Sequence, residues 1–86
     1  MNAENDLQGY SSIDLLAEDL EARLIKEYGP ILSGETLQRS LGFRTLESLR
    51  QAIARGTLEV TVFSLKHRRG KYALAKDVAR WLAERR

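Results

Sequence analysis

A run of cationic side chains lies between residues 66 and 71 of the 86-residue chain. Five of these six residues carry or can accept a positive charge, namely Lys66, His67, Arg68, Arg69 and Lys71. Such side chains repel one another, and a turn that needed only solubility would use Asn, Asp or Ser beside its Gly. A negatively charged ligand is therefore expected, and phosphate suits the run because its oxygens accept from Lys and Arg without a demanding geometry. His67 by itself is better explained as a solvated loop residue.

A second set of polar side chains recurs at helical spacing just upstream. Leu46, Leu49 and Ile53 fall at i, i+3 and i+7, which predicts a helix buried on one side, with Thr45 as its N-cap and Gly56 beyond its end. Arg can bond guanine bidentately and Gln can bond adenine, so the outer face has residue types that read the major groove of DNA. Any solvated helix can also look like this, and that alternative stays open for the segment alone. The candidate residues are Arg44, Ser48, Arg50, Gln51 and Arg55.

Further elements would position these side chains. Residues 33–42 predict a short helix that begins at Ser33 and ends at Gly42, and with the following helix they form a helix-turn-helix pattern. After residue 56 the period changes to alternation, which predicts strands over residues 58–63 and 72–74, joined by the cationic bend. A last helix from residue 76 or 77 to 86 places Trp81 where we expect the anchor of the core.

A long amphipathic helix is expected before this unit. Residues 1–11 are polar and predict a flexible acidic tail, and residues 12–29 predict the helix, with a capping box of Ser11 and Asp14. Its apolar stripe either packs on the chain's own domain, residues 30–86, or pairs two copies as a homodimer. The sequence leaves both open. The stripe consists of Ile13, Leu16, Leu20 and Leu24.

Charge and composition exclude several classes of protein. Residues 1–28 carry seven acidic and two basic side chains, a net charge of −5, whereas residues 29–86 carry five acidic and twelve basic ones, a net charge of +7. A polyanionic partner for the C-terminal two-thirds is expected. With no Cys and one His, neither a disulfide framework nor a metal site is expected, and no cofactor motif is present.

The sequence also gives no sign of catalysis or of a membrane segment. No Gly-rich phosphate loop and no carboxylate pair in an apolar setting occurs, so an enzyme is not expected. No apolar run is long enough to span a bilayer, and the N-terminus is polar and acidic where a secretory signal would be basic and then apolar. We therefore expect no membrane association and a cytoplasmic location.

Two stretches resemble a known family: residues 32–42, LSGETLQRSLG, and residues 69–82, RGKYALAKDVARWL. The chain resembles the small winged helix-turn-helix regulators related to MerR, in the branch of phage excisionases and AlpA-type or pyocin-activator-type transcription regulators. The second stretch is the more specific. In that family a basic, Gly-containing wing precedes a strand, a short polar link, and an Asp-Val or Asp-Leu pair three residues ahead of Trp-Leu. The resemblance covers residues 31–84.

The resemblance implies a mainly α fold with a β-hairpin, in which a winged helix-turn-helix follows a long N-terminal helix in the order α-α-α-β-β-α. It implies sequence-specific binding of double-stranded DNA by a transcription regulator or excisionase-like factor. The candidate helix would face the major groove, and residues 66–71 would form the wing. The long N-terminal helix is not part of the family's minimal module.

Another class of function is a protein-interaction module, antitoxin-like or adaptor-like, that binds a partner through the acidic N-terminal helix. In that case the basic run serves solubility alone. RNA is less favoured, because the predicted strands lack the exposed aromatic pairs that stack unpaired bases.

Overall fold

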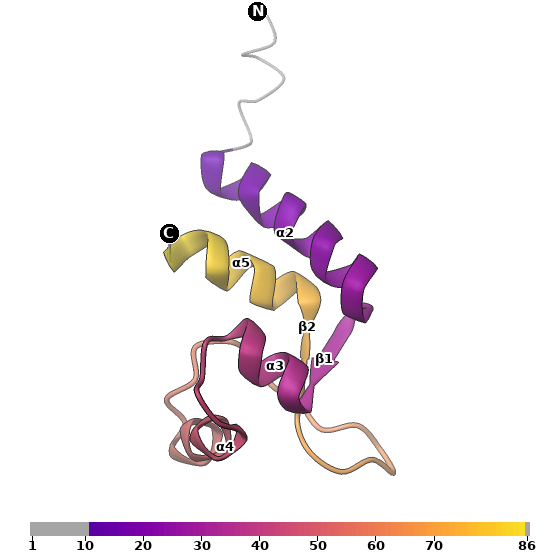
Figure 1. Cartoon of the computed structure of the whole chain (residues 1–86), viewed down its shortest axis with the longest axis vertical. Helices are drawn as coiled ribbons and strands as arrows, with labels where there is room; N and C mark the ends of the chain where they lie inside the picture. Colours follow the sequence, from indigo (N-terminus) through magenta and orange to yellow (C-terminus); the bar gives the residue numbers. More distant parts are fainter. Residues whose placement is uncertain (1–10, 86) are drawn as a thin grey trace, which may run out of the picture.

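The computed structural model describes residues 11–85. It is mainly helical with a two-stranded antiparallel sheet, as the sequence predicted (Figure 1). The tail predicted for residues 1–11 lies, apart from Ser11, outside the described residues. In chain order the elements are α2 (Ser12–Tyr28), β1 (Ile31–Ser33), α3 (Gly34–Ser40), α4 (Leu46–Arg55), β2 (Tyr72–Leu74) and α5 (Ala75–Arg85).

Helix α2 begins at the predicted capping box. The Ser11 hydroxyl accepts from the backbone N–H of Asp14 at 3.1 Å, and the Asp14 carboxylate accepts from the N–H of Ser11 at 2.9 Å. Two of the helix's otherwise unpaired N–H groups are thereby satisfied. The helix ends at Gly29, whose N–H donates to the carbonyl of Ile25 at 2.8 Å.

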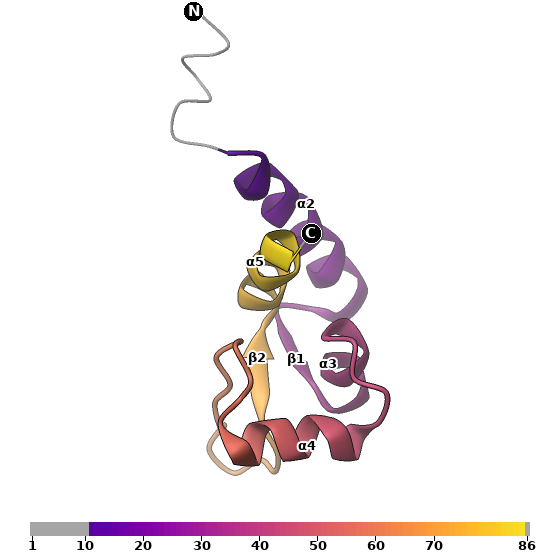
Figure 2. The same cartoon turned by 90° about the vertical axis from the view of Figure 1, so that its left-hand side faces the viewer.

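The apolar face of α2 packs against α5, and the two helices lie side by side in both views of the molecule (Figure 2). Ala17 is buried, and Leu24 packs against the main core. Leu16 and Leu20 are half-buried, while Ile13, at the start of the stripe, remains 40% exposed. The stripe is thus largely used within the chain, which favours the intramolecular alternative over pairing of two copies.

The sheet differs from the predicted hairpin in its first strand. β2 pairs antiparallel with β1, so that Ile31 faces Leu74, and residues 58–63 contribute only an isolated bridge between Phe63 and Tyr72. The observed order is therefore α-β-α-α-β-α within the described residues. The alternation upstream of Phe63 predicts a strand, but in the structure it corresponds to one-sided burial of a segment that bends at Glu59 and Val60, with Val60 buried and its neighbours on either side exposed.

The core lies where β1, β2, α3 and α5 meet. Its largest fully buried side chains are Leu32, Leu37 and Val78. Trp81, expected as the anchor, is half-buried at the core's edge: its indole N–H donates to the Glu59 carboxylate at 2.8 Å, so the ring is held near the surface by its polar end. The residues of the buried cluster are Leu32, Leu37, Leu41, Leu49, Val60, Ala73, Ala75 and Val78.

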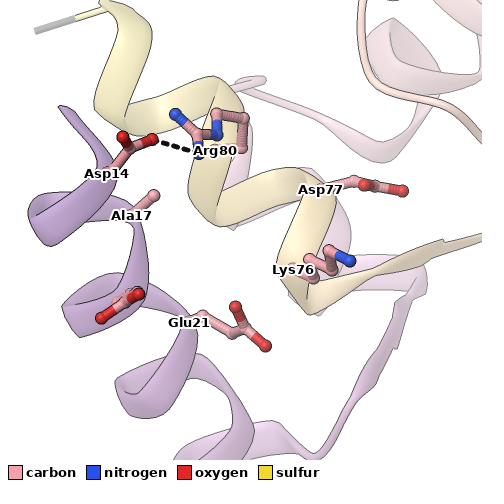
Figure 3. A pocket seen from close by; sticks show the side chains of 7 residues that line it. Asp14, Ala17, Glu21, Lys76, Asp77 and Arg80 are labelled. Carbon is pink, nitrogen blue, oxygen red and sulfur yellow. Dashed lines mark hydrogen bonds and ion pairs between the residues drawn. The ribbon is translucent and has the colours of Figure 1, made fainter. Parts of the chain in front are cut away.

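One ion pair joins the first turn of α2 to the middle of α5. Arg80 donates to the Asp14 carboxylate at 2.6 Å (Figure 3). The pKa of Asp14 lies below its ordinary value of 3.8, chiefly because the backbone N–H of Ser11 donates to the carboxylate and next because Arg80 does. The Asp14 carboxylate therefore contributes both to the start of α2 and to its attachment to α5.

Leu37→Ala is expected to lower the free energy of unfolding by about 2 to 5 kcal/mol, because it leaves a void in the core. Leu15→Ala makes the same change in another helix at a side chain that is 48% exposed, and it should cost less than about 1 kcal/mol. Urea denaturation of both variants measures the contrast. Equal losses would contradict this assignment of the core.

Asp14→Asn is expected to destabilise the protein in a pH-dependent way. Because the pKa of Asp14 is lower in the folded state, its carboxylate stabilises the fold above the unfolded value near 3.8 and loses that effect as the pH falls through the folded value. The difference in unfolding free energy between parent and variant should be constant from pH 7 to about 5 and shrink below about 3.8. Arg80→Gln removes the contribution of Arg80 and leaves that of Ser11, so it should reproduce part of the effect. A difference that does not change with pH would refute the linkage.

Candidate nucleic-acid interface

A tight turn sets the direction of α4 relative to α3. Gly42 has a φ of 83°, a left-handed conformation that L side chains rarely adopt. Two hydrogen bonds between Gln38 and Phe43 hold the turn against α3. The side-chain N–H of Gln38 donates to the backbone carbonyl of Phe43 at 3.0 Å, and the backbone N–H of Phe43 donates to the backbone carbonyl of Gln38 at 3.0 Å. These bonds hold the turn between α3 and α4, and the turn lies at Gly42, where the sequence predicted one.

Helix α4 begins at the predicted cap. The Thr45 hydroxyl accepts from the backbone N–H of Ser48 at 3.0 Å and lies 2.9 Å from the Ser48 hydroxyl. Leu49 is buried, and Leu46 and Ile53 pack against the core. The inner face predicted for this helix is therefore the one observed.

The candidate residues of this segment do not share one environment. Arg44, Arg50, Gln51 and Arg55 are exposed. Ser48 is half-buried, and its hydroxyl and N–H both engage the Thr45 cap. Ser48 therefore belongs to the start of the helix more than to an outward-facing surface.

The predicted wing is a loop that projects from the same end of the molecule as α4. Its tip is a turn in which the N–H of Arg68 donates to the carbonyl of Leu65 at 3.1 Å and His67 has a φ of 66°. Lys71 donates to the Ser64 hydroxyl at 3.0 Å across the base of the loop. The predicted wing residues, all exposed, are Lys66, His67, Arg68, Arg69 and Lys71.

A groove of about 590 Å³ separates α4 from the return limb of the loop. Leu46, Leu49 and Ile53 form its apolar floor, and it brings together three predicted site residues, Arg50, Arg69 and Lys71. The other predicted residues lie outside this groove. They are Arg44, Ser48, Gln51, Arg55, Lys66, His67 and Arg68.

The cations of this end have no acidic partner in the described part of the chain. Between residues 11 and 85 four ion pairs form, and none involves a predicted site residue. Residues 44–71 carry seven basic and two acidic side chains. The positive charge around the groove is therefore available to an anionic ligand.

Sequence reasoning missed Ala54 as a site residue. It is exposed, lines the groove, and follows Arg50 by one helical turn, so a ligand can approach α4 closely beside that guanidinium. The only signal in the sequence was a small residue at i+4 from a candidate Arg, and that pattern is common on solvated helices.

A second hollow of about 480 Å³ is lined by side chains of α2 and α5 (Figure 3). Its charged side chains have both signs, and Asp14 and Arg80 neutralise each other. Across residues 11–85, no group of three or more His, Cys, Asp or Glu side chains could hold a metal ion. The groove beside α4 is therefore the better candidate for a site.

Comparison with protein-family models, with curated proteins and with solved structures finds no significant match. The likeness to MerR-related regulators thus stays a prediction from the sequence. Among the described helices, none is long and apolar enough to cross a membrane.

His67→Gly is expected to leave the free energy of unfolding within about 1 kcal/mol of the parent, because relief of the left-handed φ offsets the greater backbone entropy of Gly. His67→Val, with a β-branched side chain at the same φ, should be less stable than the Gly variant by about 1 to 2 kcal/mol. Chemical denaturation compares them. Equal stability of the two variants would mean that the turn does not fix this φ.

Proposed function

We propose that this protein binds double-stranded DNA sequence-specifically, with α4 in the major groove and the loop of residues 66–71 on the neighbouring phosphate backbone or minor groove. The observation that carries the proposal is the convergence of Arg50 from α4 with Arg69 and Lys71 from the loop on one groove. Segments far apart in the sequence thereby present their cations to the same ligand. A polyanion that spans both segments suits this arrangement.

The two segments are suited to different parts of a duplex. α4 has ten residues, about 15 Å of helix, and its outer face offers Arg50 and Gln51 to base edges. The loop offers a cluster of exposed cations, which suits phosphates, whose contacts position a protein without reading sequence. Arg44 and Arg55, at the two ends of α4, are placed to hold the flanking backbone.

Ser48 has a changed role in this proposal. Because the Thr45 cap engages both its hydroxyl and its N–H, direct base reading falls to Arg50 and Gln51, and Ser48 sets where the helix begins. Ala54 lets the duplex approach α4 beside Arg50.

The biological role proposed is that of a small transcription regulator or excisionase-like factor acting in the cytoplasm, by binding and not by catalysis. The sequence resemblance supports this role and leaves activation, repression and assistance of recombination open. A homodimer through the stripe of Ile13, Leu16, Leu20 and Leu24 has less support, since that face packs mostly on α5.

The protein-interaction module is a second candidate, and one observation favours it. Leu15 and Ile25 on α2 are 48% and 40% exposed, although α2 already buries its opposite face against α5. Large apolar side chains on an acidic helix can serve a protein contact. This candidate needs no role for the cations around the groove, and it is therefore the weaker of the two.

Gln51→Ala should weaken binding to the preferred duplex by about 1 to 3 kcal/mol and leave binding to a scrambled duplex nearly unchanged, because a base contact is lost. Arg68→Ala combined with Arg69→Ala should weaken binding to both duplexes and flatten the plot of log K against log salt by about two units, because two phosphate contacts are lost. Fluorescence anisotropy at several salt concentrations measures both effects.

The matched control is Arg23→Ala, which removes a cation that pairs with Asp19 on α2 and does not line the groove, and it should alter neither affinity nor salt slope. If the Gln51 and loop variants affect both duplexes equally, α4 does not read bases. If neither variant binds less tightly than the control, the DNA-binding proposal is wrong.

A further inference from the structure

The groove beside α4 has one property that phosphates alone do not satisfy. Its floor is aliphatic, formed by Leu46, Leu49 and Ile53, while Arg50 and Arg69 stand at its rim. Phosphate oxygens can pair with the rim but leave the floor in contact with water. A ligand that satisfies the whole groove carries carboxylates together with aliphatic side chains.

The same chain displays a surface of that chemistry on α2. Leu15, Glu18, Ala22 and Ile25 follow one another at intervals of three and four residues and therefore form one strip, and all four are exposed. This acidic strip, named for Glu18, lies on the exposed side of α2, and Glu18 also lines the hollow between α2 and α5. Glu18 has no ion-pair partner in the described part of the chain.

We infer that the acidic strip of one copy docks in the groove of a second copy. Within one molecule α2 and α4 lie at opposite ends, so the contact can form only between molecules (Figure 1). The charges are complementary: α2 has five acidic and two basic side chains, whereas the groove rim offers Arg50, Arg69 and Lys71. The Glu18 carboxylate of the strip pairs with a cation of the rim, and Leu15 or Ile25 covers the floor.

The geometry of such a contact determines whether the copies form a closed dimer or an open chain. The two surfaces differ, so the contact is heterologous: each copy keeps a free groove at one end and a free strip at the other, and the chain of copies stays open. Both surfaces are small, so the association should be weak and evident at high protein concentration. Exposed charges dominate the contact, so salt should weaken it.

Sedimentation velocity of the parent over a range of concentrations, without DNA, tests the inference. The weight-average mass should rise steadily past that of a dimer at low salt and fall back toward the monomer when salt is raised about tenfold. A strict monomer at low salt, an assembly that stops at two copies, or association that salt strengthens would each overturn the inference. Because DNA is absent, such a failure leaves the DNA-binding proposal intact.

Two blocked variants make the test specific. The groove variant carries Arg50→Glu and Arg69→Glu, and the strip variant carries Leu15→Ser and Glu18→Arg. Each alone should associate at least tenfold more weakly than the parent, because like charges then face each other. Mixed together, they should form dimers of one copy of each and nothing larger, since one intact groove meets one intact strip. A mixture that stays monomeric would exclude the proposed pairing of surfaces.

The controls apply the same charge changes outside the two surfaces. Lys66→Glu with Arg68→Glu alters the loop beyond the groove, and Glu27→Arg alters α2 away from the strip. Both should weaken association less than the blocked variants do, because they change the long-range charge and remove no proposed contact. Thermal unfolding of every variant confirms that its fold persists, since all the altered side chains are exposed. Control variants that associate as weakly as the blocked ones would show that net charge alone, and not the groove, governs association.

Discussion

Close packing at a few alanines determines how the parts of this protein meet. Ala73, Ala75 and Ala79 have no exposed surface, and the N–H of Ala75 donates to the carbonyl of Pro30 at 2.8 Å. Small side chains at these positions allow strand, helix and connecting backbone to approach one another closely. β2 passes into α5 without an intervening loop. The orientation of α5, and through it of α2, therefore depends on the same contacts that hold the base of the cationic loop.

Local features of the fold were predictable because their causes lie within a few residues. The capping box at Asp14 and the cap at Thr45 each need side chains three positions apart, and both formed as predicted. The pairing of β1 with β2 was not predictable in this way, since three residues have no period and their partner lies about forty residues further along. Trp81 was misplaced because residue size predicts burial only on average.

The candidate site was predictable in its residue types and not in its geometry. Clustered cations and a Gln on an amphipathic helix can be read from the chain. The sequence does not show which of these side chains lie close together, because that depends on the placement of the α3–α4 turn and of the loop. Both placements are set by tertiary contacts. Arg50 lines the groove together with Arg69 and Lys71. Ser48, which the sequence also proposed as a DNA-binding residue, lies instead within hydrogen-bonding distance of Thr45. Short-range hydrogen bonding can remove a candidate that spacing alone would keep.

The separation of charge between the two ends has a consequence at distances larger than any contact. α2 carries five acidic and two basic side chains, and residues 44–71 carry seven basic and two acidic ones. The molecule is therefore an electric dipole, and the field of a polyanion exerts a torque that turns the basic end forward during diffusion. This torque acts within a few Debye lengths, each about 8 Å at physiological salt. In the proposed complex with DNA it would shorten the rotational search that precedes docking, so the encounter rate would depend on α2 although α2 lies far from the groove.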